Sequence, residues 1–267
     1  MSAFFMSDHA SVAAKSSTVM VDGKPRYYEP APKNIDVDAF RQVVMSRRSV
    51  RKFTDKPIPK AVVDDCLDMA LLAPCSSGLQ PWEFYVVRSA DKKAKLVKAC
   101  MSQLAAKTAA ELIVCVARTD RIEEFSRKML REWPMPDVPK LVQRYYQLIP
   151  YNYAPGPLNS FAMVKKAAFA VGGLVAAVPR GPYTRSEVEL WAAKSTALAC
   201  ENLVLAFRAH GYDTCMMEGF DEVRVRKLLK LPDAAFTVMV VGAGERADDG
   251  VFWPQVRFER SLFVHDV

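Results

Sequence analysis

The stretch SEVELWAAKSTALACENLVLAFRAH, residues 186–210, decides the fold. Its apolar side chains, such as Leu190, Leu198 and Leu205, surround the helix that this sequence would form rather than lining one side of it. A helix of this kind has to be buried in a protein core or at an interface between subunits. Gly211 follows at the position where glycine commonly ends a helix. We therefore predict one long buried helix here.

Helices and strands alternate along the rest of the chain. Runs of β-branched and aromatic residues predict the strands, and apolar residues at helical spacing predict the helices. In chain order these elements are a helix beginning at Asp36 or Asp38, a helix from Pro59 to Ala73, a strand at 82–87, a helix at 91–103, a strand at 112–116, the long helix, a strand ending at Met217, a helix ending at Lys230 and a strand at 236–241. The mixture predicts an α+β or α/β domain without internal repeats.

The region 119–185 is the least regular part of the chain. It contains two short predicted helices, at 125–133 and 141–148, and a loop rich in Pro, Tyr and Asn at 149–157. The apolar stretch 167–178 is too short to cross a bilayer, and we expect a buried helix or part of a lid. A lid over a substrate and a purely structural excursion both fit. We divide the chain into an N-terminal extension, 1–34, and one domain, 35–267, which includes this lid region.

The composition indicates a soluble globular enzyme or binding protein. The 267 residues carry a formal net charge of +7, which favours anionic partners such as nucleic acid, an acidic membrane or a phosphate-bearing cofactor. The basic residues are spread along the chain, as on an ordinary solvated surface. The six cysteines form no CxxC pair, and the N-terminus does not resemble a secretory signal. We therefore expect a cytoplasmic protein with reduced thiols.

The sequence lacks the residue patterns that several types of catalysis require. The three histidines, His9, His210 and His265, are too scattered for a Ser-His-Asp triad, and no cluster has metal-site spacing, so no bound metal is predicted. The segment 242–244, GAG, follows a predicted strand, but it lacks the third glycine and the helix of a dinucleotide-binding loop. These gaps favour an organic cofactor that carries the reaction while the protein binds and orients it.

A basic segment, RRSVR at 47–51, follows the first predicted helix. Arg47 and Arg51 are four residues apart with Ser49 between them, so two guanidinium groups and a hydroxyl can face one dianionic phosphate. Taken alone, such a cluster more often marks a solvated surface. Its phosphate-binding interpretation therefore depends on the segments that accompany it.

Five segments, taken in order, resemble the nitroreductase family of flavoproteins. The resemblance extends from about Asp36 to the C-terminus. It implies an α+β fold with a mainly antiparallel central sheet flanked by helices, and a homodimer that binds FMN between its subunits and uses NAD(P)H as co-substrate. The segments are RRSVRKF at 47–53, APCSSGLQPW at 73–82, the long helix through Gly211 and Tyr212, EGFD at 218–221 and QVRF at 255–258.

The resemblance also implies roles for single residues. Arg47, Ser49 and Arg257 would bind the FMN phosphate, and Arg51 would approach N1 and O2 of the flavin ring. The backbone at 218–219 would face N5, and the loop 76–80 would reach the flavin from the partner subunit. No side chain is predicted to be catalytic. The full set predicted to bind the cofactor is Arg47, Arg48, Ser49, Arg51, Ser76, Ser77, Gln80, Met217, Glu218, Gly219 and Arg257.

Three positions depart from the family pattern. Cys75 stands where serine is common, Gly78 stands where an asparagine usually hydrogen-bonds the flavin, and Gln255 stands where lysine is often found beside the phosphate. These differences indicate altered contacts to the flavin at those positions.

The implied reaction is ping-pong transfer of electrons from NAD(P)H to an electron-poor acceptor, such as a nitroaromatic, a quinone or an activated alkene. Aromatic residues of the lid region, Phe125, Tyr145, Tyr146 and Tyr151, are candidates for the walls of the acceptor pocket. One alternative is reductive dehalogenation or flavin breakdown on the same fold. Another is a basic nucleic-acid-binding module, although no such motif is present and we expect neither nucleic acid nor membrane as a partner.

Overall fold

The structure is a computed structural model that describes residues 17–21, 24–28, 35–134 and 137–267. The chain divides into two compact units. The helical unit comprises Met1–Gln42, Ser76–Gln80 and Thr119–Trp191, and the sheet unit comprises Val43–Cys75, Pro81–Arg118 and Ala192–Val267.

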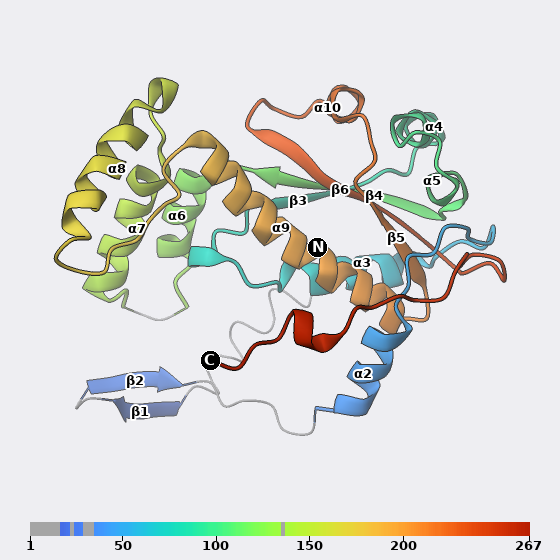
Figure 1. The fold of residues 1–267 in the computed structure, drawn as a ribbon, viewed down its shortest axis with the longest axis horizontal. Helices are drawn as coiled ribbons and strands as arrows, with labels where there is room; N and C mark the ends of the chain where they lie inside the picture. The colour runs from blue at the N-terminus through green and yellow to red at the C-terminus, as the bar shows by residue number, and fades with distance from the viewer. Residues whose placement is uncertain (1–16, 22–23, 29–34, 135–136) are drawn as a thin grey trace. The chain divides into compact units, whose positions relative to one another are not determined.

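A four-stranded antiparallel sheet forms the centre of the sheet unit (Figure 1). Its strand order is β3-β4-β6-β5, and Val114 of β4 lies opposite both Tyr85 of β3 and Val240 of β6. This arrangement confirms the predicted α+β class with a mainly antiparallel sheet flanked by helices. The strands are β3 (Trp82–Val86), β4 (Glu111–Arg118), β5 (Asp213–Met217) and β6 (Ala235–Gly244).

Helices cover both faces of this sheet, because alternate residues of each strand point to opposite faces. Leu112 and Val114 of β4 pack in a core cluster with residues of α4, α5 and α10. Ile113 and Cys115 pack in a second cluster with α3 and α9. All four side chains are fully buried, so apolar burial on both faces stabilises this three-layer unit. The helices are α3 (Lys60–Leu71), α4 (Ala90–Ala99), α5 (Leu104–Thr108), α9 (Arg185–Ala209, which begins in the helical unit) and α10 (Glu222–Leu229).

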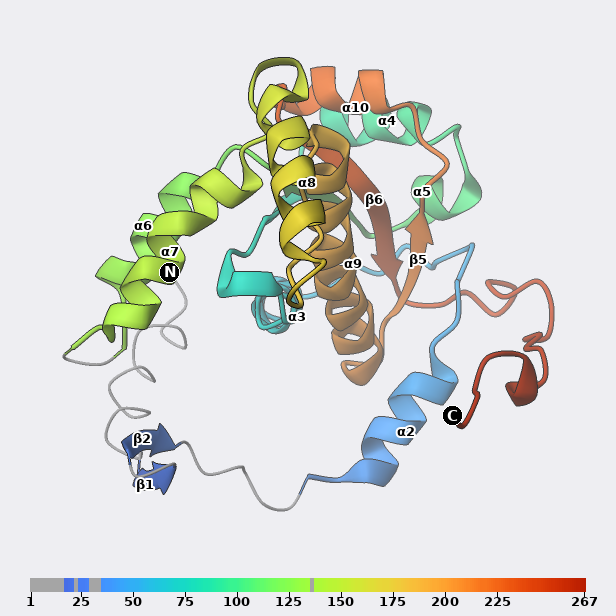
Figure 2. The same ribbon diagram turned by 60° about the vertical axis from the view of Figure 1, so that its left-hand side comes forward.

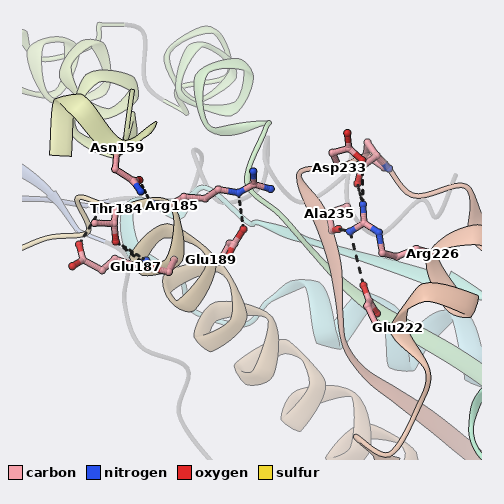
Figure 3. Close-up of polar contacts among 11 residues, drawn as sticks. Asn159, Thr184, Arg185, Glu187, Glu189, Glu222, Arg226, Asp233 and Ala235 are labelled. Atoms are coloured by element: carbon pink, nitrogen blue, oxygen red, sulfur yellow. Dashed lines mark hydrogen bonds and ion pairs between the residues drawn. The ribbon is translucent and has the colours of Figure 1, made fainter. Parts of the chain in front are cut away.

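The long helix α9 confirms the prediction made for 186–210. It begins with a capping box, in which Thr184 Oγ1 accepts the amide of Glu187 (Figure 3). The Glu187 carboxylate in turn accepts the amides of Tyr183 and Thr184, at 2.6 and 3.1 Å. These two backbone donors lower the pKa of the Glu187 carboxyl. The helix ends as expected before Gly211, whose φ is 85°.

The helix predicted at 91–103 is confirmed as α4 but ends earlier than predicted, at Ala99, and α5 begins only at Leu104. Met101 and Ser102 both have a left-handed backbone, with φ of 56° and 53°. Neither residue type favours that conformation, and no glycine or proline marks the break in the sequence.

In the helical unit, α6 and α7 pack against each other and lie side by side in both ribbon views (Figure 1, Figure 2). The loop predicted at 149–157 is partly wrong, because α7 continues to Tyr153 through Pro150. An antiparallel hairpin of β1 and β2 lies within the N-terminal extension. The elements are β1 (Ser17–Val21), β2 (Lys24–Tyr28), α2 (Val37–Ser46, which continues into the sheet unit), α6 (Ile122–Arg131), α7 (Lys140–Tyr153) and α8 (Ser160–Gly172).

The apolar stretch 167–178 forms the second half of α8 and the turn after it. Of the two alternatives expected for it, the buried helix is wrong for the chain by itself, since Val171, Leu174 and Val175 are 69%, 85% and 92% exposed. The lid stays a prediction. An apolar pattern alone cannot distinguish a helix buried in its own chain from one whose surface stays open. No helix among the described residues is long and apolar enough to cross a lipid bilayer.

Candidate functional site

The basic segment is fixed along the edge of the sheet beside β5. Ser49 forms a parallel bridge with Thr214, and the amide of Val50 donates to the Thr214 carbonyl at 3.0 Å. On the other side, the amide of Arg51 donates to the carbonyl of Gly250 at 2.8 Å. The segment is therefore held between β5 and the loop that follows β6.

Gly250 allows the loop after β6 to approach the backbone of the basic segment closely. A Cβ atom at this position would lie 2.5 Å from the carbonyl oxygen of Lys52 and 2.9 Å from that of Ala247. Both atoms belong to the backbone, so a larger residue would displace the loop. Lys52 Nζ also pairs with Asp249 Oδ2 at 2.7 Å, and this contact lowers the pKa of the Asp249 carboxyl. Segment and loop thus form one connected wall.

The segment and the C-terminal residues 251–257 enclose a cavity of about 240 Å³. Arg47, Ser49 and Arg51 line this cavity, whereas Val50 is completely buried in the core. Arg48 reaches the same cavity from the segment, and Arg257 reaches it from the C-terminal side. The structure therefore brings five of the predicted cofactor-binding residues together; we call them the arginine cradle.

The arginine cradle is strongly positive because no carboxylate of the described residues neutralises its four guanidinium groups. No Asp or Glu lines the cavity, and none of the four arginines forms an ion pair within the described part of the chain. Two of them donate to carbonyl oxygens instead: Arg48 to Trp253 at 2.6 Å and Arg257 to Val256 at 2.8 Å. Because like charges repel at this density, the site favours a ligand with several negative charges.

Cys215 of β5 lies within the electrostatic reach of Arg51. Burial raises the pKa of its thiol, and the nearby guanidinium offsets only part of that rise. A thiol with a raised pKa stays protonated and is a poor nucleophile. All six cysteines are free thiols, and every one except the half-buried Cys75 is buried, as expected of small core residues.

The turn after β5 presents its backbone at the surface. The carbonyl of Gly219 accepts a hydrogen bond from Gln103 Nε2 at 2.8 Å, whereas its amide is bound to no other described residue. Glu218 is exposed, but the side chain of Met217 is buried in the core, so Met217 can offer a ligand only its backbone. The Gly219 amide is thus free among the described residues, and Gln103 helps to fix its position.

The remaining predicted residues, Ser76, Ser77 and Gln80, belong to the helical unit. Ser77 has a left-handed backbone, with φ of 62°, and its hydroxyl lies 2.6 Å from the hydroxyl of Tyr145. Its carbonyl accepts a hydrogen bond from the hydroxyl of Tyr146 at 3.1 Å. These bonds tie the loop 76–80 to α7. Gln80 lines a separate, smaller cavity, of about 100 Å³, together with Phe125.

Ser76 and Ser77 open onto an aromatic cavity of about 190 Å³. Its walls include the rings of Tyr145, Phe169 and Tyr183, and the last two are stacked with their centroids 5.7 Å apart. Of the aromatic residues predicted as pocket walls, Tyr145 lines this cavity, whereas Tyr146 is buried with its hydroxyl bound to the loop. Tyr151 lies on the surface, 74% exposed.

Two polar residues that shape these sites were absent from the predicted set. Lys165 donates to the carbonyls of Asn152 and Ala154, both at 2.7 Å, and so caps the end of α7; partial burial lowers the pKa of its ammonium. The other is Gln103, whose partner Gly219 is 116 residues away. No local sequence signal reveals contacts between residues so far apart along the chain.

Comparison with known proteins fixes the family. A sequence model of the nitroreductase family matches residues 44–245, which is most of the chain. The chain belongs to the nitroreductase family. This confirms the resemblance found in the sequence and the oxidoreductase class that it implies.

Proteins from several bacteria are similar to the chain along most of its length. It is 25% identical over 210 residues to a Thermus thermophilus NADH dehydrogenase, covering 79% of this chain and 88% of that protein. It is 27% identical over 222 residues to Bacillus subtilis YdgI, provisionally named an NAD(P)H nitroreductase; the match covers 81% of this chain and 92% of YdgI. An Exiguobacterium sibiricum protein solved in complex with FMN has the same fold, with a TM-score of 0.63 and 23% identity. The match covers 89% of this chain and 100% of that protein.

Proposed function

We propose that this protein is an FMN-dependent oxidoreductase that transfers electrons from NAD(P)H to an electron-poor organic acceptor by a ping-pong mechanism. The observation that carries the proposal is the arginine cradle, where four arginines and Ser49 line one cavity without a carboxylate. The names of similar proteins, an NADH dehydrogenase and a provisional NAD(P)H nitroreductase, support the nicotinamide donor. The FMN complex of the Exiguobacterium protein supports the cofactor.

The residues of the arginine cradle fit the phosphate end of FMN. Guanidinium groups donate paired hydrogen bonds to phosphate oxygens, and the Ser49 hydroxyl adds a neutral donor between Arg47 and Arg51. Gln255, which departs from the family pattern, also lines this cavity and can donate an amide hydrogen bond in place of a lysine. A phosphate dianion would relieve the repulsion among the arginines, so its binding would be favoured by charge.

The turn at Glu218 and Gly219 fits the ring end of the cofactor. Thr214 lies beside Ser49, and five extended residues from there to Gly219 span on the order of 16 Å, which suits a ligand as long as FMN. We assign the free amide of Gly219 to N5 of the flavin and Arg51 to the N1 edge, where its charge would stabilise the reduced ring. When bound, FMN accepts a hydride from NAD(P)H and passes the electrons to the acceptor.

The aromatic cavity of the helical unit fits a flat acceptor. Its volume of about 190 Å³ suits a single substituted ring, and its walls offer faces for stacking. Lys165 lines it, but the ammonium is already bound to three carbonyl oxygens, including that of Tyr151 at 3.2 Å. We therefore propose nitroaromatics, quinones or activated alkenes without a required carboxylate as acceptors.

We also propose a homodimer, in which the loop with Ser76, Ser77 and Gln80 contacts the flavin bound by the partner subunit. Large apolar side chains that the single chain leaves exposed support this assembly. On α2 they include Phe40 and Met45, at 57% and 69%, and near the C-terminus Trp253 and Phe258, at 71% and 74%. Apolar surface of this extent commonly marks a protein interface. Light scattering from the purified protein would give twice the mass of the chain.

The test of the proposed function begins with the visible spectrum of the purified protein. We expect the absorption of bound flavin, release of FMN on denaturation, bleaching by NADH or NADPH without oxygen, and return of colour when an acceptor is added. Parallel lines in double-reciprocal plots would establish ping-pong kinetics. A colourless protein that also fails to bind added FMN would contradict the proposal. Halide release or cleavage of the flavin ring would instead identify the alternative reactions on this fold.

A further inference from the structure

The helices α4 and α10 of the sheet unit share a second positive hollow, of about 420 Å³, which contains no residue of the arginine cradle. It contains five cationic side chains and a single carboxylate. We call it the lysine hollow, and its lining residues are Asp91, Lys92, Lys95, Lys98, Arg224, Lys227 and Leu228.

Ion pairs neutralise only two of the five cations. Asp91 pairs with Lys95 at 2.7 Å, and Arg224 pairs with Asp221 at 2.9 Å. The other three, Lys92, Lys98 and Lys227, form no ion pair within the described ranges of the chain. All three are exposed, so their ammonium groups remain available.

Other basic residues of the same helices are used for structure. Lys93 donates to the carbonyls of Ala109 and Ala110, both at 2.7 Å. On α10, Arg226 turns to Ala235, Asp233 and Glu222 (Figure 3). These helices thus use one cation each to bind the rest of the unit and direct the others into a common hollow.

The backbone beneath the hollow is well fixed. The side chain of Ser89 caps α4 by accepting the amide of Lys92 at 3.2 Å, and Asp221 caps α10 by accepting that of Arg224 at 3.1 Å. The amide of Asp221 also donates to the carbonyl of Ala99 at 2.8 Å, which joins the end of α4 to the start of α10. Ligand binding would therefore require ordering of lysine side chains only.

We propose that the lysine hollow binds a small ligand with two or more linked phosphate groups. Three unpaired ammonium groups from two helices match a multiply charged anion, whereas a single carboxylate would leave two of them unneutralised. No aromatic side chain lines the hollow, so a nucleotide base or a single nucleic-acid strand has nothing to stack on. The recognised chemistry is the oligophosphate chain, whether it is free or part of a nucleotide.

Titration of the full-length protein with tripolyphosphate in a calorimeter tests the proposal. We compare the wild type with a triple variant, Lys92→Gln, Lys98→Gln and Lys227→Gln. A control variant, Lys60→Gln, Lys107→Gln and Lys230→Gln, loses the same charge from the same unit outside the hollow. A contact between an exposed lysine and phosphate is worth a few-fold in affinity, so the first variant should bind at least about tenfold more weakly. The control should stay within about twofold, and both should bind FMN as the wild type does.

ATP should bind about as tightly as tripolyphosphate, and the affinity of both should fall as salt is raised. Equal losses in the two triple variants would attribute binding to the net charge of the protein and overturn the proposal. Absence of binding by the wild type at low salt would also overturn it. So would a duplex DNA that binds more tightly than tripolyphosphate and loses that binding in the first variant. The single variant Lys227→Gln should show a modest loss of affinity for tripolyphosphate, and it repeats the test with the smallest change to the structure.

Discussion

Two groups of arginines in the sheet unit differ in what neutralises them. Arg208 at the end of α9 and Arg246 after β6 both bind Asp213, the first residue of β5, and Asp213 is only 3% exposed. Arg246 binds both carboxylate oxygens, at 2.7 and 2.9 Å, and Arg208 binds one at 2.8 Å. Among the described residues, no carboxylate lines the arginine cradle. The same residue type thus serves structure in one place and is left free in the other.

This difference in pairing gives a criterion for distinguishing charged side chains that stabilise the fold from those that bind a ligand. A cation whose partner is a buried carboxylate is part of the fold, and removing either partner leaves the other uncompensated. A group of cations without a partner weakens the folded state by repulsion, which an anionic ligand would relieve. On this criterion we expect the Asp213 group to stabilise the unit and the arginine cradle and the lysine hollow to bind anions.

The largest expected effect is on the Asp213 group. Asp213→Asn removes the charge but keeps the shape, and it leaves two guanidinium groups without an anion. We expect the free energy of unfolding to fall by about 3 kcal/mol, because a mostly buried ion pair loses one partner. Urea denaturation at saturating FMN measures it, with the exposed Asp55→Asn as the control. A loss no larger than that of the control would remove the distinction between the two groups.

The arginine cradle should show the opposite behaviour. Arg257→Ala should weaken FMN binding by about 10- to 100-fold, the usual cost of one charged hydrogen bond to phosphate. The free energy of unfolding without FMN should stay within about 0.5 kcal/mol of the wild type, because Arg257 is exposed and forms no ion pair in the described chain. Fluorescence titration of FMN gives the affinity, and Arg88→Ala, at another exposed arginine of the unit, is the control. Unchanged FMN affinity would exclude Arg257 from the phosphate site.

Much of this fold could be predicted from the sequence, because the local order of apolar residues indicates which helices and strands are buried. The continuous apolar run at 112–116 predicts a buried strand, and the long apolar run at 186–210 predicts one helix. The break at Met101 and Ser102 could not be predicted, since neither residue type favours a left-handed backbone. The exposure of α8 could not be predicted either, because an apolar helix looks the same whether its own chain or another covers it.

The candidate site follows the same division. Arg47, Ser49 and Arg51 could be predicted as a group, because two arginines four residues apart with a serine between them suit one phosphate. That Arg257 lies at the same cavity came from the family resemblance and not from any local pattern. Gln103 could not be found, because its contact with Gly219 depends on how the loop after α4 packs against the turn after β5.

The turn after β5 gives a smaller expected effect. Gly219→Ala places a Cβ 3.2 Å from Gln103 Nε2, at a glycine whose backbone does not have a positive φ, so the turn should still fold. The methyl group would hold a flavin ring away from the amide, and we expect reduction by NADH about tenfold slower with a small loss of FMN affinity. Stopped-flow absorbance measures this rate. Glu218→Ala is the matched control, because the assigned group is backbone, and it should change the rate by less than about twofold. Equal effects of the two substitutions would contradict the backbone assignment.

The smallest expected effect concerns Lys52, a cation beside the arginine cradle that does have a partner. Its contact lowers the pKa of the Asp249 carboxyl, so the pair adds stability above the ordinary aspartate pKa of roughly 3.9 and loses it as the pH falls through the lowered value. Asp249→Asn should therefore unfold slightly more easily than the wild type at pH 7, and the difference should vanish in acid below that lowered pKa. Because both side chains are exposed, the effect should be far smaller than that of Asp213→Asn. Urea denaturation across this pH range, with Asp248→Asn as the control, measures it. A difference that grew in acid would mean that Asp249 stabilises the loop by something other than its charge.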